Sequence, residues 1–416
     1  MKRTVLILTM FLVSLASGQA LDVVRPESVG LSSERLARID RTFQELVEQG
    51  QLAGVSLLIS RRGQVAYRRD LGFMDVENRK TMSPDALFRI ASMTKALTAV
   101  AVLQLFEQGR FMLNDPAGES IPVLKTMRVL DPNQTGADPN RPRTVPLERD
   151  ITIRDLLRHT AGIYGGSRYT RAGLRNWTGS LEGFVERLAS VPLDCQPGTQ
   201  FQYSYSTDVL GHLVEVVSGE PLDAYFAKHI LAPLDMRDTG FVVPPEKVSR
   251  LTNHYRFADG HLVCQEEAAT SPFLRRAEAL SGGGGWSYSY PGVVTTVRDW
   301  RRFLEMLRRH GQLDGVRILS PHTVKLMCSD HLGTIPGAFE PGAGFGLGMG
   351  IVTDSVQHGQ LASNGTIYWA GGPHNTYYFV DFQEQMCGIF FMQTEPWNHL
   401  DLMRRFLVLS HQAIQE

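Results

Sequence analysis

A long apolar stretch that carries a single lysine constrains this chain more than any other feature. Residues 91–105 contain no glycine or proline and are apolar on almost every face of a helix, which predicts a helix buried on all sides. Lys95 lies inside this stretch, three residues after Ser92, so the two side chains stand one helical turn apart on the same face. Because a buried amine needs a polar partner, we expect Lys95 to contact the Ser92 hydroxyl.

This pairing points to nucleophilic chemistry. Burial favours the neutral form of an amine, and a neutral Lys95 can accept the proton of Ser92 near neutral pH. The first turn of a helix also directs free backbone N–H groups toward whatever approaches Ser92. The alternative is a core helix with a snorkelling lysine at one end, because a Ser-x-x-Lys match by itself arises easily by chance.

The composition is that of an ordinary globular protein. With 416 residues, 43% of them hydrophobic and 20% charged, the chain can bury a core in one large domain or two. Its 42 basic and 43 acidic residues form no block of like charge, so we expect no nucleic-acid partner. The four cysteines form no Cys-x-x-Cys pair and their pairing stays open, although the apolar run around Cys387 predicts a buried free thiol.

Residues 1–20 have the pattern of a secretory signal peptide. Lys2 and Arg3 precede an apolar run over 5–15, and small residues follow as far as Ala20. We therefore expect an exported protein, either periplasmic or secreted. The apolar run is too short to span a bilayer comfortably and no later run is long enough, so no stable membrane span is expected after the signal is removed.

The periodicity of the remaining chain predicts a mixed α/β fold of the α+β kind. Helices are expected at 32–48, 91–105, 152–158, 181–189, 207–218, 221–231, 297–310 and about 400–413, and strands at 54–60, 64–70, 345–352, 375–382 and 385–393. This order predicts an antiparallel sheet that is flanked by helices and built from both chain ends, with an inserted, mainly helical domain. We expect one catalytic unit over 21–416, in which 21–90 and 290–416 form the α/β part and 91–289 the helical part.

Two further stretches have an unusual composition. Residues 199–211 are a polar, aromatic loop that contains Tyr203-Ser204-Tyr205 and runs into a helix, and residues 365–372 contain Trp369-Ala370-Gly371-Gly372 before a strand. Together with Ser92-x-x-Lys95, the chain resembles the serine β-lactamase and penicillin-binding-protein superfamily, and more closely its class C branch with the family VIII carboxylesterases. Supporting phrases at 157–162, 209–211, 231–236 and 314–319 occur in the family's order, so the resemblance covers nearly all of the mature chain.

The resemblance implies a role for each of these positions. Ser92 would be the nucleophile that accepts the acyl group, Lys95 its proton partner, and Tyr203 the base or proton shuttle. The backbone N–H groups of Ser92 and Gly372 would form the oxyanion hole. The substrate site would include Trp369, Gly371 and Tyr205. The resemblance implies no metal and no cofactor, and the sequence carries neither a zinc-binding helix nor a phosphate-binding loop.

Departures from the family pattern indicate the substrate. Trp369 stands where β-lactam- and peptide-cleaving relatives place a lysine that holds the substrate's carboxylate, and Tyr205 stands where an asparagine bonds a substrate amide. Both changes remove polar groups, which favours a neutral ester with apolar flanks. The glycine run 282–285 indicates a tight backbone approach. His159 is interpreted as a structural residue in a helix-to-loop corner, and His374 as lining the cleft at most.

The sequence therefore predicts an exported serine hydrolase that takes a small-molecule ester or β-lactam, and the leading expectation is a carboxylesterase on short to medium acyl esters. One alternative on the same scaffold is a β-lactamase or D-alanyl-D-alanine carboxypeptidase. An alternative of another class is an inactive homologue that binds or scaffolds the cell wall, although intact Ser92, Lys95 and Tyr203 argue against it. The acyl and alcohol groups and the oligomeric state stay open.

Overall fold

An eight-stranded antiparallel sheet organises the structure, a computed structural model that describes residues 21–133, 142–164, 166–274, 282–283 and 292–415. Its strands run in the order β12-β13-β14-β15-β16-β1-β2-β3, so the first and last parts of the chain meet where β1 pairs with β16. The predicted sheet built from both chain ends is thus confirmed. The strands are β1 (Gly54–Arg61), β2 (Gln64–Asp75), β3 (Lys80–Thr81), β12 (Ala343–Phe345), β13 (Gly350–Val352), β14 (Ile367–Ala370), β15 (Tyr377–Asp381) and β16 (Met386–Met392).

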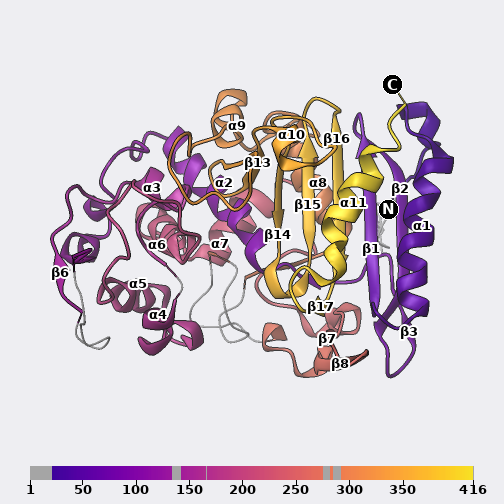
Figure 1. The fold of residues 1–416 in the computed structure, drawn as a ribbon, viewed down its shortest axis with the longest axis horizontal. Coiled ribbons are helices and arrows are strands. Elements are labelled where there is room, and N and C mark those ends of the chain that lie inside the picture. The colour runs from indigo at the N-terminus through magenta and orange to yellow at the C-terminus, as the bar shows by residue number, and fades with distance from the viewer. Residues whose placement is uncertain (1–20, 134–141, 165, 275–281, 284–291, 416) are drawn as a thin grey trace, which may run out of the picture.

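Helices cover both faces of this sheet. Alternate residues of β1 point to opposite faces, so Leu57 and Ile59 pack in a core with α1 (Ser33–Glu48) and α11 (Leu402–His411). Leu58 points the other way, into the larger core that contains α8 (Val297–Arg308). Figure 1 shows α11 lying across the sheet, with α1 along the edge formed by the N-terminal strands.

The remaining long helices gather at the other end of the molecule (Figure 1). Their centre is α2 (Thr94–Glu107), which packs against α6 (Ser206–Ser218) and is buried on nearly every face, as predicted. Around them lie α3 (Ile153–Leu157), α4 (Ser167–Arg171), α5 (Leu181–Ala189) and α7 (Leu222–Phe226). The predicted helix at 221–231 is α7 followed by a π-helical turn over Ala227–Leu231.

The expectation of one strand over 345–352 was wrong. The segment forms the end of β12, a turn and β13, because the Gly346 N–H bonds the Met349 carbonyl at 2.8 Å and Gly348 adopts a φ of 90°. A Cβ built on Gly348 would lie 2.7 Å from the Ala99 side chain. The turn therefore packs directly onto α2, and glycine is needed there both for the backbone angle and for the space.

Several short elements carried no clear sequence signal. A three-stranded sheet joins β17 (Thr394–Glu395), β7 (His254–Ala258) and β8 (His261–Glu266), and β8 is partly exposed along its whole length, so its side chains show no apolar alternation. The other elements of this kind are β4 (Phe88–Arg89), β5 (Val129–Leu130), β6 (Thr144–Val145), β9 (Val294–Thr295), α9 (Pro321–Met327) and α10 (Ser355–His358). The short strands β10 (Gln312–Leu313) and β11 (Val316–Arg317) pair as a hairpin around a turn that the sequence does indicate.

The sequence predicted a buried free thiol at Cys387 and no membrane-spanning helix after the signal peptide. All four cysteines are free thiols and Cys387 is buried in the core, which confirms the prediction for Cys387. Within the described residues, every helix is too short or too polar to cross a bilayer. The predicted signal peptide at 1–20 lies outside the described residues.

Candidate active site

Ser92 lies in a strained turn at the entrance to α2. The turn is a 3-10 helix, η2 (Ala91–Met93), so the α-helix itself begins at Thr94 and not at the predicted residue 91. Ala91 adopts a φ of 40°, a left-handed conformation that costs a non-glycine residue about 1–3 kcal/mol. Strain of this kind persists only where the surroundings hold it, and Ser92, the next residue along the chain, is half-buried.

The Lys95 side chain is fully buried and meets Ser92 as predicted. Its Nζ lies 3.3 Å from Ser92 Oγ, which confirms the expected contact one turn apart. The amine also donates to the Gly283 carbonyl and lies over the Tyr203 ring, 4.6 Å from the ring centroid. The structure therefore brings together Ser92, Lys95 and Tyr203 around one buried nitrogen atom.

Tyr203 is held by the corner after α3. The His159 ring packs 4.8 Å from the Tyr203 ring, and His159 Nδ1 accepts the Ser204 N–H at 3.2 Å. Burial, followed by the electrostatic effect of the nearby Lys95 amine, holds the pKa of His159 well below its ordinary value, so the imidazole is neutral. With Nδ1 accepting, Nε2 carries the proton and faces Thr207 Oγ1 at 3.4 Å. His159 thus fixes the loop before α6, which agrees with a structural role.

The corner is itself fixed at the start of α3. Thr152 caps the helix, and its side chain exchanges hydrogen bonds with Asp155 in a capping box. The buried Asp155 carboxylate also accepts the Thr160 hydroxyl at 2.8 Å and Arg149 Nη1 at 2.6 Å. These bonds connect Thr160, the residue after His159, to the start of α3. They therefore restrain the position of the His159 imidazole.

The end of β14 packs against the turn that carries Ser92. The Gly371 N–H bonds the Thr376 carbonyl at 2.7 Å, and a Cβ built on Gly371 would lie 2.6 Å from the Ile90 carbonyl, next to the strained Ala91. Gly372, at a φ of 47°, opens the short 3-10 helix η10 (Gly372–His374), which contacts η2. The Gly371–Gly372 backbone therefore lies beside the Ser92 turn, where an oxyanion hole requires it.

Aromatic rings form one side of the site. Trp369 lies 5.2 Å from Tyr203, 5.2 Å from Phe345 and 5.8 Å from Phe339, measured between ring centroids. We call Tyr203, Phe339, Phe345 and Trp369 the aromatic wall. Phe339 and Phe345 were missed in the sequence; the only signal was a large apolar residue, Phe339, in a glycine- and proline-rich segment, and its side chain is 55% exposed.

Tyr205 lies elsewhere. Its ring is buried and packs 6.1 Å from Tyr169 of α4 and 5.5 Å from Phe184 of α5. Burial raises the pKa of Tyr205 well above its ordinary value, so the phenol is neutral. The structure thus places Tyr205 in the helical core and not in the aromatic wall, and its role toward substrate stays a prediction.

The sequence also singled out the glycine run 282–285 and His374, and the structure shows what surrounds Gly282, Gly283 and His374. Gly282 and Gly283 lie against α2 and α6, the close backbone approach that the glycine run indicated; Gly284 and Gly285 lie outside the described residues. The His374 ring is buried 4.6 Å from His254. Burial, followed by the charges of His254 and Arg89, holds the pKa of His374 well below its ordinary value. His374 therefore lies beneath the Gly372 turn as a neutral side chain.

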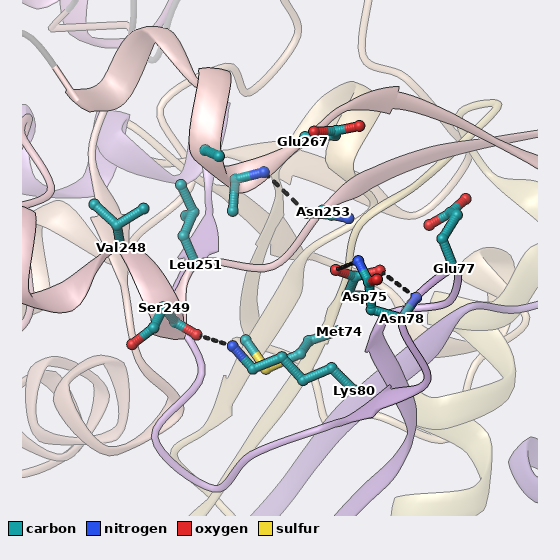
Figure 2. A pocket seen from close by; sticks show the side chains of 12 residues that line it. Met74, Asp75, Glu77, Asn78, Lys80, Val248, Ser249, Leu251, Asn253 and Glu267 are labelled. Carbon is teal, nitrogen blue, oxygen red and sulfur yellow. Dashed lines mark hydrogen bonds between the residues drawn. The ribbon is translucent and has the colours of Figure 1, made fainter.

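A cavity of about 270 Å³ lies away from these residues, between the β2–β3 connection and the segment after β8 (Figure 2). Two of its three carboxylates are engaged in local bonds: Asp75 accepts Asn78 Nδ2 at 2.8 Å, and Glu77 accepts the Tyr255 hydroxyl at 2.7 Å. None of the predicted site residues lines this cavity. Across the described parts of the chain, no group of three His, Cys, Asp or Glu side chains could hold a metal ion.

Comparison with known proteins identifies the scaffold. The profile of the Beta-lactamase family matches residues 39–413. The chain belongs to the Beta-lactamase family. Esterase EstB of Burkholderia gladioli is 30% identical over 86% of this chain and 90% of its own length, and protein Rv1367c of Mycobacterium tuberculosis is 33% identical over 85% and 89%.

A solved structure supports the same placement. EstCE1, described as a hydrolase with promiscuous acyltransferase activity, matches this Beta-lactamase family member with a TM-score of 0.78 and 27% identity, over 92% of this chain and 99% of its own. The predicted superfamily and its esterase-like branch are thereby confirmed, as is the fold of helices around an antiparallel sheet. The protein is a serine hydrolase of the β-lactamase fold.

Proposed function

We propose that this protein is a carboxylesterase that forms an acyl-enzyme at Ser92 and acts on short to medium acyl esters. The observation that carries the proposal is the position of Trp369 in the aromatic wall, joined to the Ser92–Lys95 pair through Tyr203. An aromatic side chain replaces the cation that would hold a substrate carboxylate, so the site favours a neutral acyl group. The similarity to esterase EstB supports this choice.

The geometry supports a two-step reaction. Lys95 and Tyr203 take the Ser92 proton while Oγ attacks the ester carbonyl, and the developing oxyanion accepts hydrogen bonds from the Ser92 and Gly372 N–H groups. The tetrahedral intermediate collapses as the C–O bond to the alcohol breaks, and the alcohol leaves with the proton. Water then attacks the acyl-Ser92 ester and gives one proton to the Lys95 and Tyr203 side chains. The bond between the acyl carbon and Ser92 Oγ breaks, the acid is released, and this water-derived proton passes to Ser92 Oγ.

The test is the burst of alcohol from a p-nitrophenyl ester. We expect a burst equal to the enzyme concentration, an acyl adduct on the Ser92 peptide in the mass spectrum, and loss of both in Ser92→Ala. Ser218→Ala, which removes a similarly half-buried hydroxyl bonded to the Val214 carbonyl, serves as the matched control and should keep both. A Ser92→Ala protein that hydrolyses the ester as fast as the parent would overturn the proposal.

Parallel incubations separate the alternatives. A β-lactamase or D-alanyl-D-alanine carboxypeptidase would turn over a penicillin or a D-Ala-D-Ala peptide faster than the ester, whereas we expect slow labelling or none. An inactive scaffold would fail to react with a fluorophosphonate probe, whereas we expect Ser92-dependent labelling. The same serine chemistry could pass the acyl group to an alcohol, as the description of EstCE1 suggests, so adding an alcohol tests for transfer.

We also propose that the protein is exported, on the pattern of residues 1–20. Expression of the full chain followed by fractionation should place activity outside the cytoplasm. N-terminal sequencing of the mature protein should begin after Gly18 or Ala20.

A further inference from the structure

One peptide bond is held between the two helices that carry the site. It joins Gly282 to Gly283 and lies between α2 and α6. Thr98 approaches it from α2, one turn after Lys95 and on the same face of the helix. Asp208 approaches it from the first turn of α6, which begins directly after the Tyr203 loop. The Thr98 and Asp208 side chains are both fully buried.

Each helix binds one end of this peptide group. Thr98 Oγ1 donates to the Gly282 carbonyl at 2.6 Å, and the Gly283 N–H donates to Asp208 Oδ1 at 3.1 Å. The next carbonyl along the chain, that of Gly283, accepts the Lys95 amine. The acceptor of the Lys95 amine is therefore attached to a peptide group that two buried side chains hold in place.

The Gly282–Gly283 backbone packs tightly against α6. A Cβ built on Gly282 would lie 2.8 Å from the Thr207 carbonyl, and one built on Gly283 would lie 2.5 Å from Asp208 Oδ2. The backbone is thus pressed against α6, and a shift away from this helix would lengthen the hydrogen bond from the Gly283 N–H to Asp208. The position of the Gly283 carbonyl follows from these two side chains.

We propose that Thr98 and Asp208 are positioning residues for Lys95. By fixing the Gly282–Gly283 peptide they fix the Gly283 carbonyl, which orients the Lys95 amine so that its free side faces Ser92 Oγ. This inference rests on the proposed function, because it gives Lys95 its role as proton partner of Ser92. Proton transfer depends steeply on this alignment, and a displacement of about 1 Å costs on the order of 10²-fold in rate.

The decisive variants are Thr98→Val and Thr98→Ser. Valine has the shape of threonine but cannot donate to the Gly282 carbonyl, whereas serine can. We expect Thr98→Val to lower kcat on a p-nitrophenyl ester by about ten-fold or more while KM stays within about two-fold, because alignment is lost and binding is kept. Thr98→Ser should restore most of kcat. The rate of fluorophosphonate labelling at Ser92 should fall and recover in parallel.

Thr252→Val is the matched control. Thr252 is as buried as Thr98, and its hydroxyl donates to the Leu87 carbonyl at 2.9 Å, outside the site. It should lower the Tm by an amount similar to Thr98→Val and leave kcat unchanged. If Thr98→Val keeps the parent kcat, or if both valine variants lower kcat equally, the positioning role is wrong.

Substitutions of Asp208 provide a second, independent test of the positioning role. Asp208→Asn keeps an acceptor for the Gly283 N–H and should retain kcat within a few-fold, whereas Asp208→Leu should lose about as much as Thr98→Val. If Asp208→Leu does not fold, the Thr98 pair decides the question alone. Ser92→Ala distinguishes a failure of the proposed function from a failure of the positioning role. If Ser92→Ala still hydrolyses the ester, the proposed function is wrong. If Ser92→Ala is inactive and Thr98→Val is fully active, only the positioning role is wrong.

Discussion

The Lys95 amine lies over the face of the Tyr203 ring, with Nζ 4.6 Å from the ring centroid and 3.3 Å from Ser92 Oγ. Tyr203 can therefore contribute in two separable ways: its π-face contacts the amine, and its hydroxyl is the group proposed to transfer the proton. His159 and Trp369 pack on the same ring, at 4.8 and 5.2 Å, and fix its plane. Variants that remove only the hydroxyl can distinguish the two contributions.

Tyr203→Phe keeps every ring contact and removes the hydroxyl. If the phenol shuttles the proton, kcat on a p-nitrophenyl ester should fall by about 10² to 10⁴ with little change in KM or Tm. Steady-state kinetics and thermal unfolding check this. Tyr169→Phe is the control, because it removes a buried tyrosine hydroxyl outside the aromatic wall and should leave kcat unchanged. A Tyr203→Phe enzyme with the parent's kcat would contradict the shuttle.

Lys95→Met replaces the amine with an apolar side chain of similar length in a fully buried position. We expect kcat/KM to fall by about 10² to 10⁴, because Ser92 loses its proton partner, while the Tm does not fall. The double variant Ser92→Ala with Lys95→Met should be no slower than Ser92→Ala alone, since the two residues act as a unit. Additive losses in the double variant would show that they act separately.

Gly371→Ala should be far more damaging than Gly372→Ala. A Cβ at 371 would lie 1.9 Å from Thr376 Oγ1 and 2.6 Å from the Ile90 carbonyl, so β14 must move away from the Ser92 turn. We expect about a 10²-fold or greater loss of kcat/KM and roughly 1–3 kcal/mol of destabilisation in urea unfolding. Adding Thr376→Ala should not restore activity, because the Ile90 carbonyl still blocks the Cβ.

At Gly372 the added methyl group meets open space, so the cost is backbone strain at a φ of 47°, about 1–2 kcal/mol. The backbone N–H stays in place. We therefore expect Gly372→Ala to keep measurable ester hydrolysis. Equal loss in the two alanine variants would mean that steric contact with Ile90 is not what sets the position of β14.

Phe339→Ala should change acyl-chain preference. The ring is exposed and contacts Tyr203 at 5.9 Å and Trp369 at 5.8 Å, so it extends the aromatic wall toward solvent. Removing it should lower kcat/KM for hexanoyl or octanoyl esters by about ten-fold through lost apolar contact, and leave acetyl esters nearly unchanged. A series of p-nitrophenyl esters measures this. Uniform loss across the series would place Phe339 outside the acyl site.

The Asp155 carboxylate makes the free energy of unfolding depend on pH. Burial raises its pKa, but hydrogen bonds from Arg149, Thr152 and Thr160 outweigh burial and lower the pKa to about 2, from an ordinary value of 3.8. A carboxylate with a lowered folded-state pKa stabilises the fold above its unfolded-state value and loses this stabilisation as the pH falls. The difference corresponds to roughly 2 kcal/mol, lost between about pH 5 and pH 2.

Urea unfolding of the parent and Asp155→Asn across this pH range provides the check. The parent should be more stable at neutral pH, and the difference in free energy of unfolding should narrow as the pH falls from about 5 toward 2. A difference that is constant with pH would assign the whole effect to lost hydrogen bonds. A difference that widens in acid would contradict the lowered pKa.

The sequence by itself determined the buried helix, the contact inside it and the sheet built from both chain ends. Residues 91–105 are apolar on almost every face of a helix, so a buried helix was predictable, and a spacing of three residues in a helical turn brings Lys95 to Ser92 wherever that helix packs. Period-two and helical patterns at both ends of the chain were strong enough to predict the sheet and its flanking helices. These features depend on local geometry, which the order of residues specifies directly.

Only the tertiary structure decided what surrounds that pair. The aromatic wall brings Tyr203 together with Phe339, Phe345 and Trp369, residues more than a hundred positions further along the chain, and no local pattern marks them as neighbours. The same packing buries Tyr205 against α4 and α5. It also holds the Gly282–Gly283 peptide between α2 and α6 through hydrogen bonds to both helices. Such contacts are set by how whole elements fit against one another, because side-chain packing and backbone approach depend on distant segments that periodicity does not describe.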